Sequence, residues 1–264
     1  PRNRVKLWRM AEVVGSHFGM VNPPLVISNA CISGVLALNT AFRYIREGYY
    51  KNIIVAGGDM ITEFVVSGFL SFQALSPAAC KPFDANRTGL TIGEGCGTMI
   101  LSDSPSGRDV EITISGAAVT NDANHISGPS RTGEELALAM QRAMKEAGVN
   151  PAELDYVSAH GTATIYNDEM ESRALAFAGL SQTPVNSYKG YWGHTLGAAG
   201  VIESVLTHAC MRENLLIAST GFSEPGTPEV LNVITENCFS PINNSLKIAS
   251  GFGGCNGAVI FRKQ

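Results

Sequence analysis

The chain has 264 residues, of which 45% are hydrophobic and only 16% are charged, and its formal net charge is −4. This length can bury a substantial core, and the absence of a basic cluster disfavours nucleic acid as a partner. No apolar run approaches the length of a membrane span and no signal peptide opens the chain, so we expect no membrane partner.

The first clear unit is β-α-β, and Cys31 lies at its first junction. Residues 23–28 ("PPLVIS") are short, apolar and β-branched, which predicts a buried strand. Apolar residues recur at helical spacing over 35–48, and 51–59 ("KNIIVAGGD") predicts another buried strand. Cys31 would therefore lie at a helix N-terminus, where free N–H groups and the helix dipole favour a thiolate. A packed core cysteine is the alternative at this point.

The rest of the chain alternates between strand-like and helix-like segments. The segments are a strand over 110–120, a helix over 133–149, a strand over 154–160, a helix from about 168, a strand over 183–189, a helix over 197–214, and two strands joined by glycines over 246–254 and 257–263. Strands that alternate with helices predict a layered α/β fold.

Three polar residues fall where predicted strands end. His160 ends the strand in "SAHGTAT", Lys189 ends the strand in "NSYKGYWGH", and His194 follows five residues later, before a helix. Loops at strand ends are where α/β folds place their chemistry. Cys31 and the two histidines could converge on one pocket, although their separation in the sequence neither supports nor forbids it.

Five ordered motifs carry a resemblance to a known family. They are "NACISG", "KPFDANRTGLTIGEGCG", "SAHGTATIYNDEMES", "NSYKGYWGHTLGAAGVIES" and "SGFGGCNGAVIF". The chain resembles the β-ketoacyl-acyl-carrier-protein synthases, in the elongating, Cys-His-His branch of the thiolase-like fold. The resemblance implies two related α/β halves, each a five-stranded sheet between helices, in a helix-sheet-helix-sheet-helix arrangement. Residues 1–104 would be the remainder of the N-terminal half and 105–264 the C-terminal half.

The resemblance also implies that about the first third of the family's sequence is absent. The family usually forms dimers, so we expect a homodimer, with a heterodimer as the alternative. A chain without that first third would expose part of its sheet and its dimer surface, which is unfavourable. We therefore expect either a longer parent chain or a partly disordered or proteolysed protein.

The reaction that the family implies is a decarboxylative Claisen condensation. By resemblance, Cys31 takes an acyl group from an acyl-carrier protein as a thioester, and malonyl-acyl-carrier protein then loses CO2 to give the attacking carbanion. His160 and His194, as neutral imidazoles, would donate hydrogen bonds to the malonyl enolate. The backbone N–H groups of Cys31 and Phe252 would form the oxyanion hole for the acyl carbonyl, and Phe252 would be the gatekeeper aromatic.

The resemblance gives supporting roles to further residues. Lys189 would orient the histidines and favour their neutral form, with Asp168 and Glu171 as its anchors. These two carboxylates are equally typical of an ordinary first helical turn. Glu203 is interpreted as structural, and Phe69 would line the acyl pocket or belong to the plain core.

The spacing of cysteines and histidines disfavours a metal site, and no cofactor is expected. No CxxC or HxxxH pattern exists, and "HGT" places glycine where ligands would cluster. "GFGGCNG" fails as a dinucleotide loop, because Asn256 replaces the third glycine and a strand follows where a helix is required. The six cysteines are expected to be reduced thiols in a cytoplasmic protein.

Departures from the family keep other functions open. Ile32, Ile165, the bulky pair Tyr191-Trp192 and Cys255 stand where the family usually has other residues, so acyl length is not carried over. A specialised polyene or polyketide-type synthase is compatible with them. One alternative is a non-catalytic chain-length-factor partner, which generally lacks the cysteine. The other is a cysteine hydrolase, which would not need the second histidine.

Overall fold

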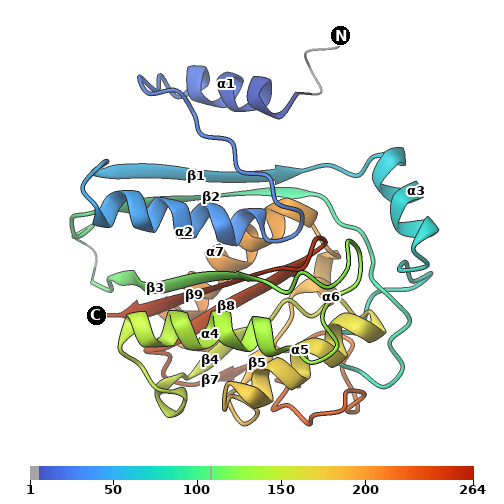
Figure 1. Cartoon of the computed structure of the whole chain (residues 1–264). Coiled ribbons are helices and arrows are strands. Elements are labelled where there is room, and N and C mark those ends of the chain that lie inside the picture. Colours follow the sequence, from blue (N-terminus) through green and yellow to red (C-terminus); the bar gives the residue numbers. More distant parts are fainter. Residues whose placement is uncertain (1–5, 108) are drawn as a thin grey trace.

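The computed structural model describes residues 6–107 and 109–264 (Figure 1). Its helices are α1 (Leu7–His17), α2 (Ser33–Arg46), α3 (Glu63–Ser71), α4 (Glu134–Ala147), α5 (Ile165–Phe177), α6 (Lys189–Trp192) and α7 (Ala199–Glu213), with short 3₁₀ turns η1 (Pro151–Glu153) and η2 (Leu196–Ala198). Its strands are β1 (Asn52–Asp59), β2 (Gly95–Ser102), β3 (Ile112–Asn121), β4 (Tyr156–Ser158), β5 (Val185–Asn186), β6 (Leu215–Leu216), β7 (Cys238–Phe239), β8 (Asn244–Gly251) and β9 (Cys255–Lys263).

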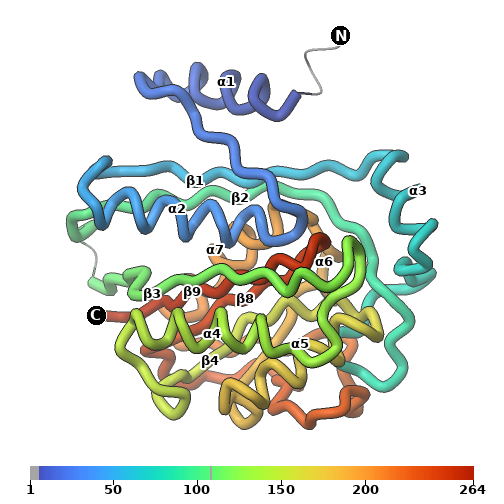
Figure 2. The backbone as a smooth tube through the Cα atoms, viewed as in Figure 1, coloured from blue at the N-terminus to red at the C-terminus, as the bar shows by residue number. Residues whose placement is uncertain are grey.

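Two stacked sheets with helices between and outside them make up most of the described chain (Figures 1 and 2). The larger sheet has the order β3-β9-β8-β4-β5, with β4 parallel to its neighbours and the pairs β3–β9 and β8–β9 antiparallel. The smaller sheet pairs β1 with β2 antiparallel. Helices α2 and α7 lie between the sheets, and α4 covers the outer face of the larger one with α5 beside it. The expected layered α/β fold is confirmed.

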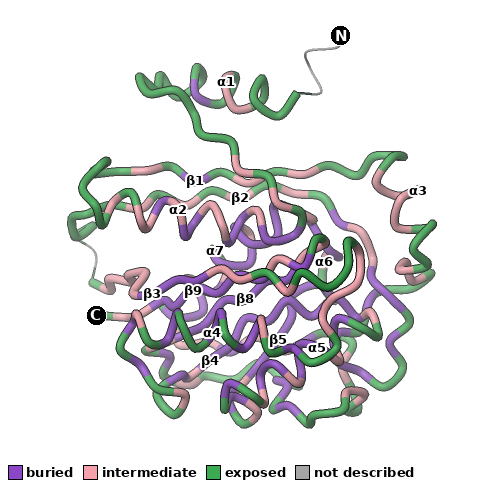
Figure 3. The backbone as a smooth tube through the Cα atoms, viewed as in Figure 1, coloured by how far each residue is buried: buried purple, intermediate pink, exposed green. Residues whose placement is uncertain are grey.

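Strands β8 and β9 form the centre of the larger sheet and are buried along almost their whole length (Figure 3). Because helices cover both faces, both sets of alternating side chains must be able to lie in the core. Apolar residues accordingly fill the middle of β9 over residues 258–261, whereas β8 mixes apolar residues with small polar ones. Lys247, in the middle of β8, is fully buried and breaks the pattern. A buried ammonium must be paired, so Lys247 marks a polar site inside the core.

The two central helices touch backbone to backbone where α2 begins and α7 begins. A Cβ atom at Gly34 would lie 2.6 Å from the Val201 nitrogen, and one at Gly200 would lie 2.4 Å from the Val35 nitrogen. Only glycine at both positions permits this close approach. The contact fixes the start of α2, and with it Cys31, against the start of α7.

The structure differs from the expected elements mainly near the N-terminus. Residues 23–28 form no strand, and the nearest pairing is a single bridge between Asn29 and Cys31. A strand must share its backbone hydrogen bonds with a neighbour, and none of the described strands pairs with this run. The strand predicted over 183–189 is limited to Val185–Asn186, because the chain turns into α6 at Lys189. The helix predicted from about 168 begins earlier, at Ile165.

Large apolar side chains are exposed on the part of the molecule built from α1, β1, β2 and α3. They include Trp8, Phe18, Ile54, Phe64 and Ile100. Figure 3 shows the same contrast, with exposed backbone around α1, β1 and α3 and buried backbone through the larger sheet. Within the described ranges, none of the helices combines the length and the hydropathy needed to cross a membrane.

The helix crossing gives a stability prediction. We expect Gly200→Ala to lower the free energy of unfolding by about 1–3 kcal/mol, because the new methyl group meets backbone that cannot move aside. Gly68→Ala is the matched control, since it lies in the exposed helix α3 with nothing within 4 Å of its Cβ position. Thermal denaturation of both variants tests this, and equal stabilities would contradict the close packing.

Candidate active site

Cys31 lies at a tight junction immediately before α2. Ala30 has a positive φ of 44°, and the Ser33 hydroxyl donates to the Ala30 carbonyl at 2.6 Å. The Asn29 N–H in turn donates to the Ser33 hydroxyl at 2.7 Å. These bonds hold the turn so that the Cys31 side chain is buried, with 8% of the residue exposed.

Three side chains from distant parts of the chain meet here. The Cys31 sulfur and a ring nitrogen from each of His160 and His194 all lie within 4.8 Å of one another. The two imidazole rings are 5.1 Å apart between centroids and nearly perpendicular, at 83°. Both histidines are buried, His160 after β4 and His194 between α6 and η2. The structure therefore brings together the three residues that the sequence singled out.

The loop that carries His160 is held by two carboxylates of α5. Glu171 accepts the backbone N–H groups of His160 (2.5 Å) and Gly161 (2.7 Å). Asp168 accepts the N–H groups of Phe83 (2.7 Å) and Thr162 (3.0 Å). Burial raises the pKa of both carboxyls, that of Glu171 to about 7. The expectation that this pair anchors Lys189 is corrected, because the hydrogen bonds that both carboxylates accept come from this loop, from Phe83 and from the Asn167 side chain.

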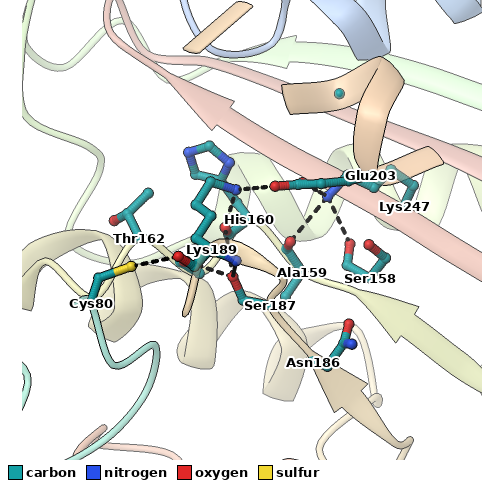
Figure 4. A network of polar contacts seen from close by, with 12 residues as sticks. Cys80, Ser158, Ala159, His160, Thr162, Asn186, Ser187, Lys189, Glu203 and Lys247 are labelled. Carbon is teal, nitrogen blue, oxygen red and sulfur yellow. Dashed lines mark hydrogen bonds and ion pairs between the residues drawn. The ribbon is translucent and has the colours of Figure 1, made fainter. Parts of the chain in front are cut away.

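The carboxylate that pairs with Lys189 is Glu203 of α7 (Figure 4). The Lys189 ammonium donates to Glu203 at 2.7 Å and to the His160 carbonyl at 2.6 Å. The Lys247 ammonium donates to the other Glu203 oxygen at 2.5 Å and to the Ala159 carbonyl at 3.0 Å. Burial opposes the Glu203 charge, but the two ammonium groups outweigh it and hold its pKa below the ordinary value. Sequence reasoning missed Lys247, although a lysine inside the apolar run of β8 was a usable signal.

Both histidines are held neutral. Burial lowers the pKa of His160 and of His194 well below the ordinary value, and the positive charges of Lys189 and Lys247 lower them further. The His194 backbone is fixed by its N–H donating to the Thr91 carbonyl at 2.7 Å. Among the described residues, both ring nitrogens of His194 lack a hydrogen-bond partner, and so does the Nδ1 atom of His160. These buried polar atoms are available to a ligand.

The resting state of Cys31 is a thiol. Burial raises its pKa to about 11, although the Lys189 charge and the backbone N–H groups of Phe252 and Cys31 act in the opposite direction. The helix N-terminus was expected to favour a thiolate, but the effect of burial on the pKa of the thiol is larger. Both N–H groups therefore act on the sulfur, and their assignment as the oxyanion hole for an acyl carbonyl stays a prediction.

Phe252 follows β8 and packs against aromatic residues of α3. Its ring stacks on Phe69 with centroids 5.5 Å apart, and Phe72 meets it edge-on at 5.4 Å. A Cβ atom at Gly251 would lie 3.1 Å from the Cys31 nitrogen, so glycine there lets the Phe252 turn approach the thiol.

Other residues noted in the sequence lie outside this cluster. Trp192 stacks on Tyr188 at 5.5 Å and lines a separate pocket of about 340 Å³ between β2 and α7. The Asp84 carboxylate accepts N–H groups from Asn86, Ser223 and Glu224, which outweigh its burial and lower its pKa to about 2. Every cysteine in the described ranges is a free thiol.

Arg87 contacts the backbone of Asp84 and the side chain of Glu169. Its guanidinium donates to the Asp84 backbone carbonyl at 3.0 Å and lies 3.9 Å from Glu169.

Comparisons with known proteins agree with this architecture. Residues 7–105 match the family "Beta-ketoacyl synthase, N-terminal domain", and residues 112–223 match "Beta-ketoacyl synthase, C-terminal domain". A putative mitochondrial 3-oxoacyl-[acyl-carrier-protein] synthase of Schizosaccharomyces pombe is 34% identical over 96% of this chain. The chain spans 64% of that protein's length.

Two solved structures superpose closely. A ketosynthase from Xenorhabdus doucetiae, in complex with its chain length factor, is 31% identical with a TM-score of 0.91, over 97% of this chain and 64% of that one. A type II polyketide synthase ketosynthase, in complex with its acyl-carrier protein, is 28% identical with a TM-score of 0.93, over 99% of this chain and 68% of that one. The two matched domains together cover most of the sequence, and the chain belongs to the β-ketoacyl synthase family.

Proposed function

We propose that the protein to which this chain belongs is an elongating β-ketoacyl-acyl-carrier-protein synthase. It would join an acyl group held on Cys31 to the two-carbon unit of malonyl-acyl-carrier protein, with loss of CO2. The observation that carries the proposal is the buried cluster of one thiol and two neutral imidazoles within 4.8 Å of one another.

In the loading step, the Cys31 sulfur attacks the carbonyl of an acyl-carrier-protein thioester. The thiol proton passes to a histidine ring nitrogen and then to the departing thiolate of the carrier, so a new thioester replaces the old one. The tetrahedral oxyanion accepts hydrogen bonds from the N–H groups of Cys31 and Phe252, and the effect of both groups on the pKa of the Cys31 thiol supports this role. Transfer of the proton during attack removes the need for a resting thiolate.

In the condensing step, the malonyl carboxylate leaves as CO2 and its bonding electrons form an enolate. His160 and His194 donate hydrogen bonds to the enolate oxygen, which neutral imidazoles can do without giving up a full proton. The nearby ammonium groups of Lys189 and Lys247, whose charges act on both histidines, also favour the negative charge of the enolate. The enolate carbon then attacks the acyl carbonyl, the C–S bond breaks, and the Cys31 thiolate takes a proton.

The partners of this reaction are also part of the proposal. The carrier is an acyl-carrier protein, as in the polyketide ketosynthase complex described above, and the assembly is a homodimer in the cytoplasm. The comparison with a ketosynthase bound to its chain length factor keeps a heterodimer open as the second candidate. Cys31 favours the catalytic member of such a pair.

The loading step can be tested by intact mass. We expect the protein to gain the mass of one acyl group when it is incubated with an acyl-carrier-protein thioester. Cys31→Ala removes the nucleophile and should abolish the adduct, whereas Cys96→Ala, at an exposed cysteine, should keep it. No adduct on a folded, full-length sample would favour the non-catalytic partner.

His194→Ala separates the two half-reactions. The variant should still form the adduct on Cys31 but should lose decarboxylation of malonyl-acyl-carrier protein by roughly 100-fold or more, because one donor to the enolate is gone. Measuring CO2 release and the mass of the adduct on the same sample tests this prediction. Unchanged decarboxylation would contradict the role of His194.

The buried Glu203 network predicts a large stability effect. Glu203→Gln leaves two buried ammonium groups without a counter-charge and should lower the free energy of unfolding by about 3–5 kcal/mol. Glu213→Gln, on the exposed end of the same helix, is the control and should change stability by less than about 1 kcal/mol. Denaturant titration measures the free energy of unfolding of both variants. An equal loss in the two variants would contradict the account.

A further inference from the structure

We propose that the cluster of Cys31, His160 and His194 also binds a divalent zinc ion, which blocks the thiol reversibly. This inference uses the side chains of the proposed function, but it does not require that the protein catalyses condensation. Its basis is the chemistry and placement of three donor atoms, none of which lies near another in the sequence.

The donor set matches what zinc prefers. One sulfur and two imidazole nitrogens are ligands of the type found in zinc sites, and three protein ligands leave a fourth position open. Zn–S bonds of about 2.3 Å and Zn–N bonds of about 2.0–2.1 Å place tetrahedral ligands roughly 3.3–3.6 Å apart. The three donors already lie within 4.8 Å of one another, so a shift of roughly 1 Å closes the set.

The histidines are prepared as ligands before any ion arrives. Both are buried and neutral, which is the form that coordinates a metal. His194 has no hydrogen-bond partner at either ring nitrogen, and His160 has none at Nδ1, among the described residues. A buried polar atom without a partner is costly, so a ligand that supplies the missing contact is favoured at His194, where both ring nitrogens are unpartnered. The backbone on both sides is fixed, by Glu171 for His160 and by Thr91 for His194.

The spacing of residues in the chain gave no sign of this arrangement. The absence of CxxC and HxxxH patterns excludes only ligands that lie close together in the sequence. Here the ligands come from the start of α2, the end of β4 and the segment before η2, which the crossing of α2 and α7 brings together.

The binding step is balanced without an oxidant or reductant. The Cys31 S–H bond breaks, its proton goes to solvent, and the sulfur and two nitrogens each donate an electron pair to Zn²⁺. The thiolate offsets one of the two positive charges of the ion. Lys189 and Lys247, only partly balanced by Glu203, oppose the remaining charge, so the site should be weaker than a four-ligand structural zinc site. Coordination draws electron density from the sulfur, and the ion occupies the space between the thiol and the two imidazoles, so attack of the sulfur on a thioester is blocked.

Cobalt is the probe that reports on the ligands directly. The full-length protein carrying Cys96→Ser and Cys238→Ser, which removes two exposed thiols, would be titrated with Co²⁺ and then with Zn²⁺. We expect one equivalent of Co²⁺ with the absorption of a tetrahedral, thiolate-bound ion, displaced by Zn²⁺. Cys31→Ala in the same background should lose the thiolate band and weaken Zn²⁺ binding by roughly 100-fold or more.

Two further measurements make the outcome decisive. Zinc should protect Cys31 from alkylation, and a chelator should restore its reactivity. His160→Ala should weaken zinc binding while leaving Cys31 open to alkylation, which separates loss of a ligand from loss of the thiol. Equal zinc binding with and without Cys31, or a cobalt spectrum without a thiolate band, would overturn the inference. Zinc binding in a protein that fails to take an acyl group would support the metal site and count against the proposed synthase.

Discussion

The buried contact of Glu203 with Lys189 and Lys247 is the interaction on which the rest of the site depends. Burying one carboxylate and two ammonium groups is costly unless every charge is paired and hydrogen-bonded. The structure meets this condition, since each ammonium also donates to a carbonyl at the end of β4. The same bonds therefore tie α6, α7 and β8 to the strand that positions His160.

This network also sets the charge of the site. Burial lowers the pKa of both histidines, and the positive charges of Lys189 and Lys247 lower it further. The imidazoles stay neutral and keep their N–H groups for donation. The thiol stays protonated as well, because burial outweighs the nearby positive charge. The resting site thus holds neutral reactants within a field that favours negative charge when it develops.

Much of this site could be predicted from local sequence. Cys31, His160, Lys189 and His194 each lie at the end of a predicted element, and such ends are visible as breaks in hydrophobic periodicity. The strands β8 and β9 could also be predicted, from the apolar run of β9 and from the glycines that join the two strands. Residues 23–28 have the same kind of apolar run but form no strand, since a strand also needs a neighbour, which local pattern cannot supply.

Pairings between distant residues could not be predicted in the same way. Asp168 and Glu171 lie close to His160 in the sequence, yet the partner of Lys189 is Glu203, one helix further on. Lys247 lies in the last part of the chain and reaches the site because β8 is adjacent to β4. The pKa of Cys31 likewise depends on how deeply the folded chain buries it, and a position at a helix N-terminus does not reveal that.

The protonation state of the two histidines tests the central claim most directly. The ring nitrogen signals of His160 and His194 would be followed by NMR on the full-length protein labelled at histidine, between about pH 5 and pH 8. His160→Gln and His194→Gln would assign them. The account predicts that both residues become cationic only well below pH 6.5, so that both imidazole signals are neutral at pH 6.5 and above. A signal from either that becomes cationic at about pH 6.5 or above would contradict it.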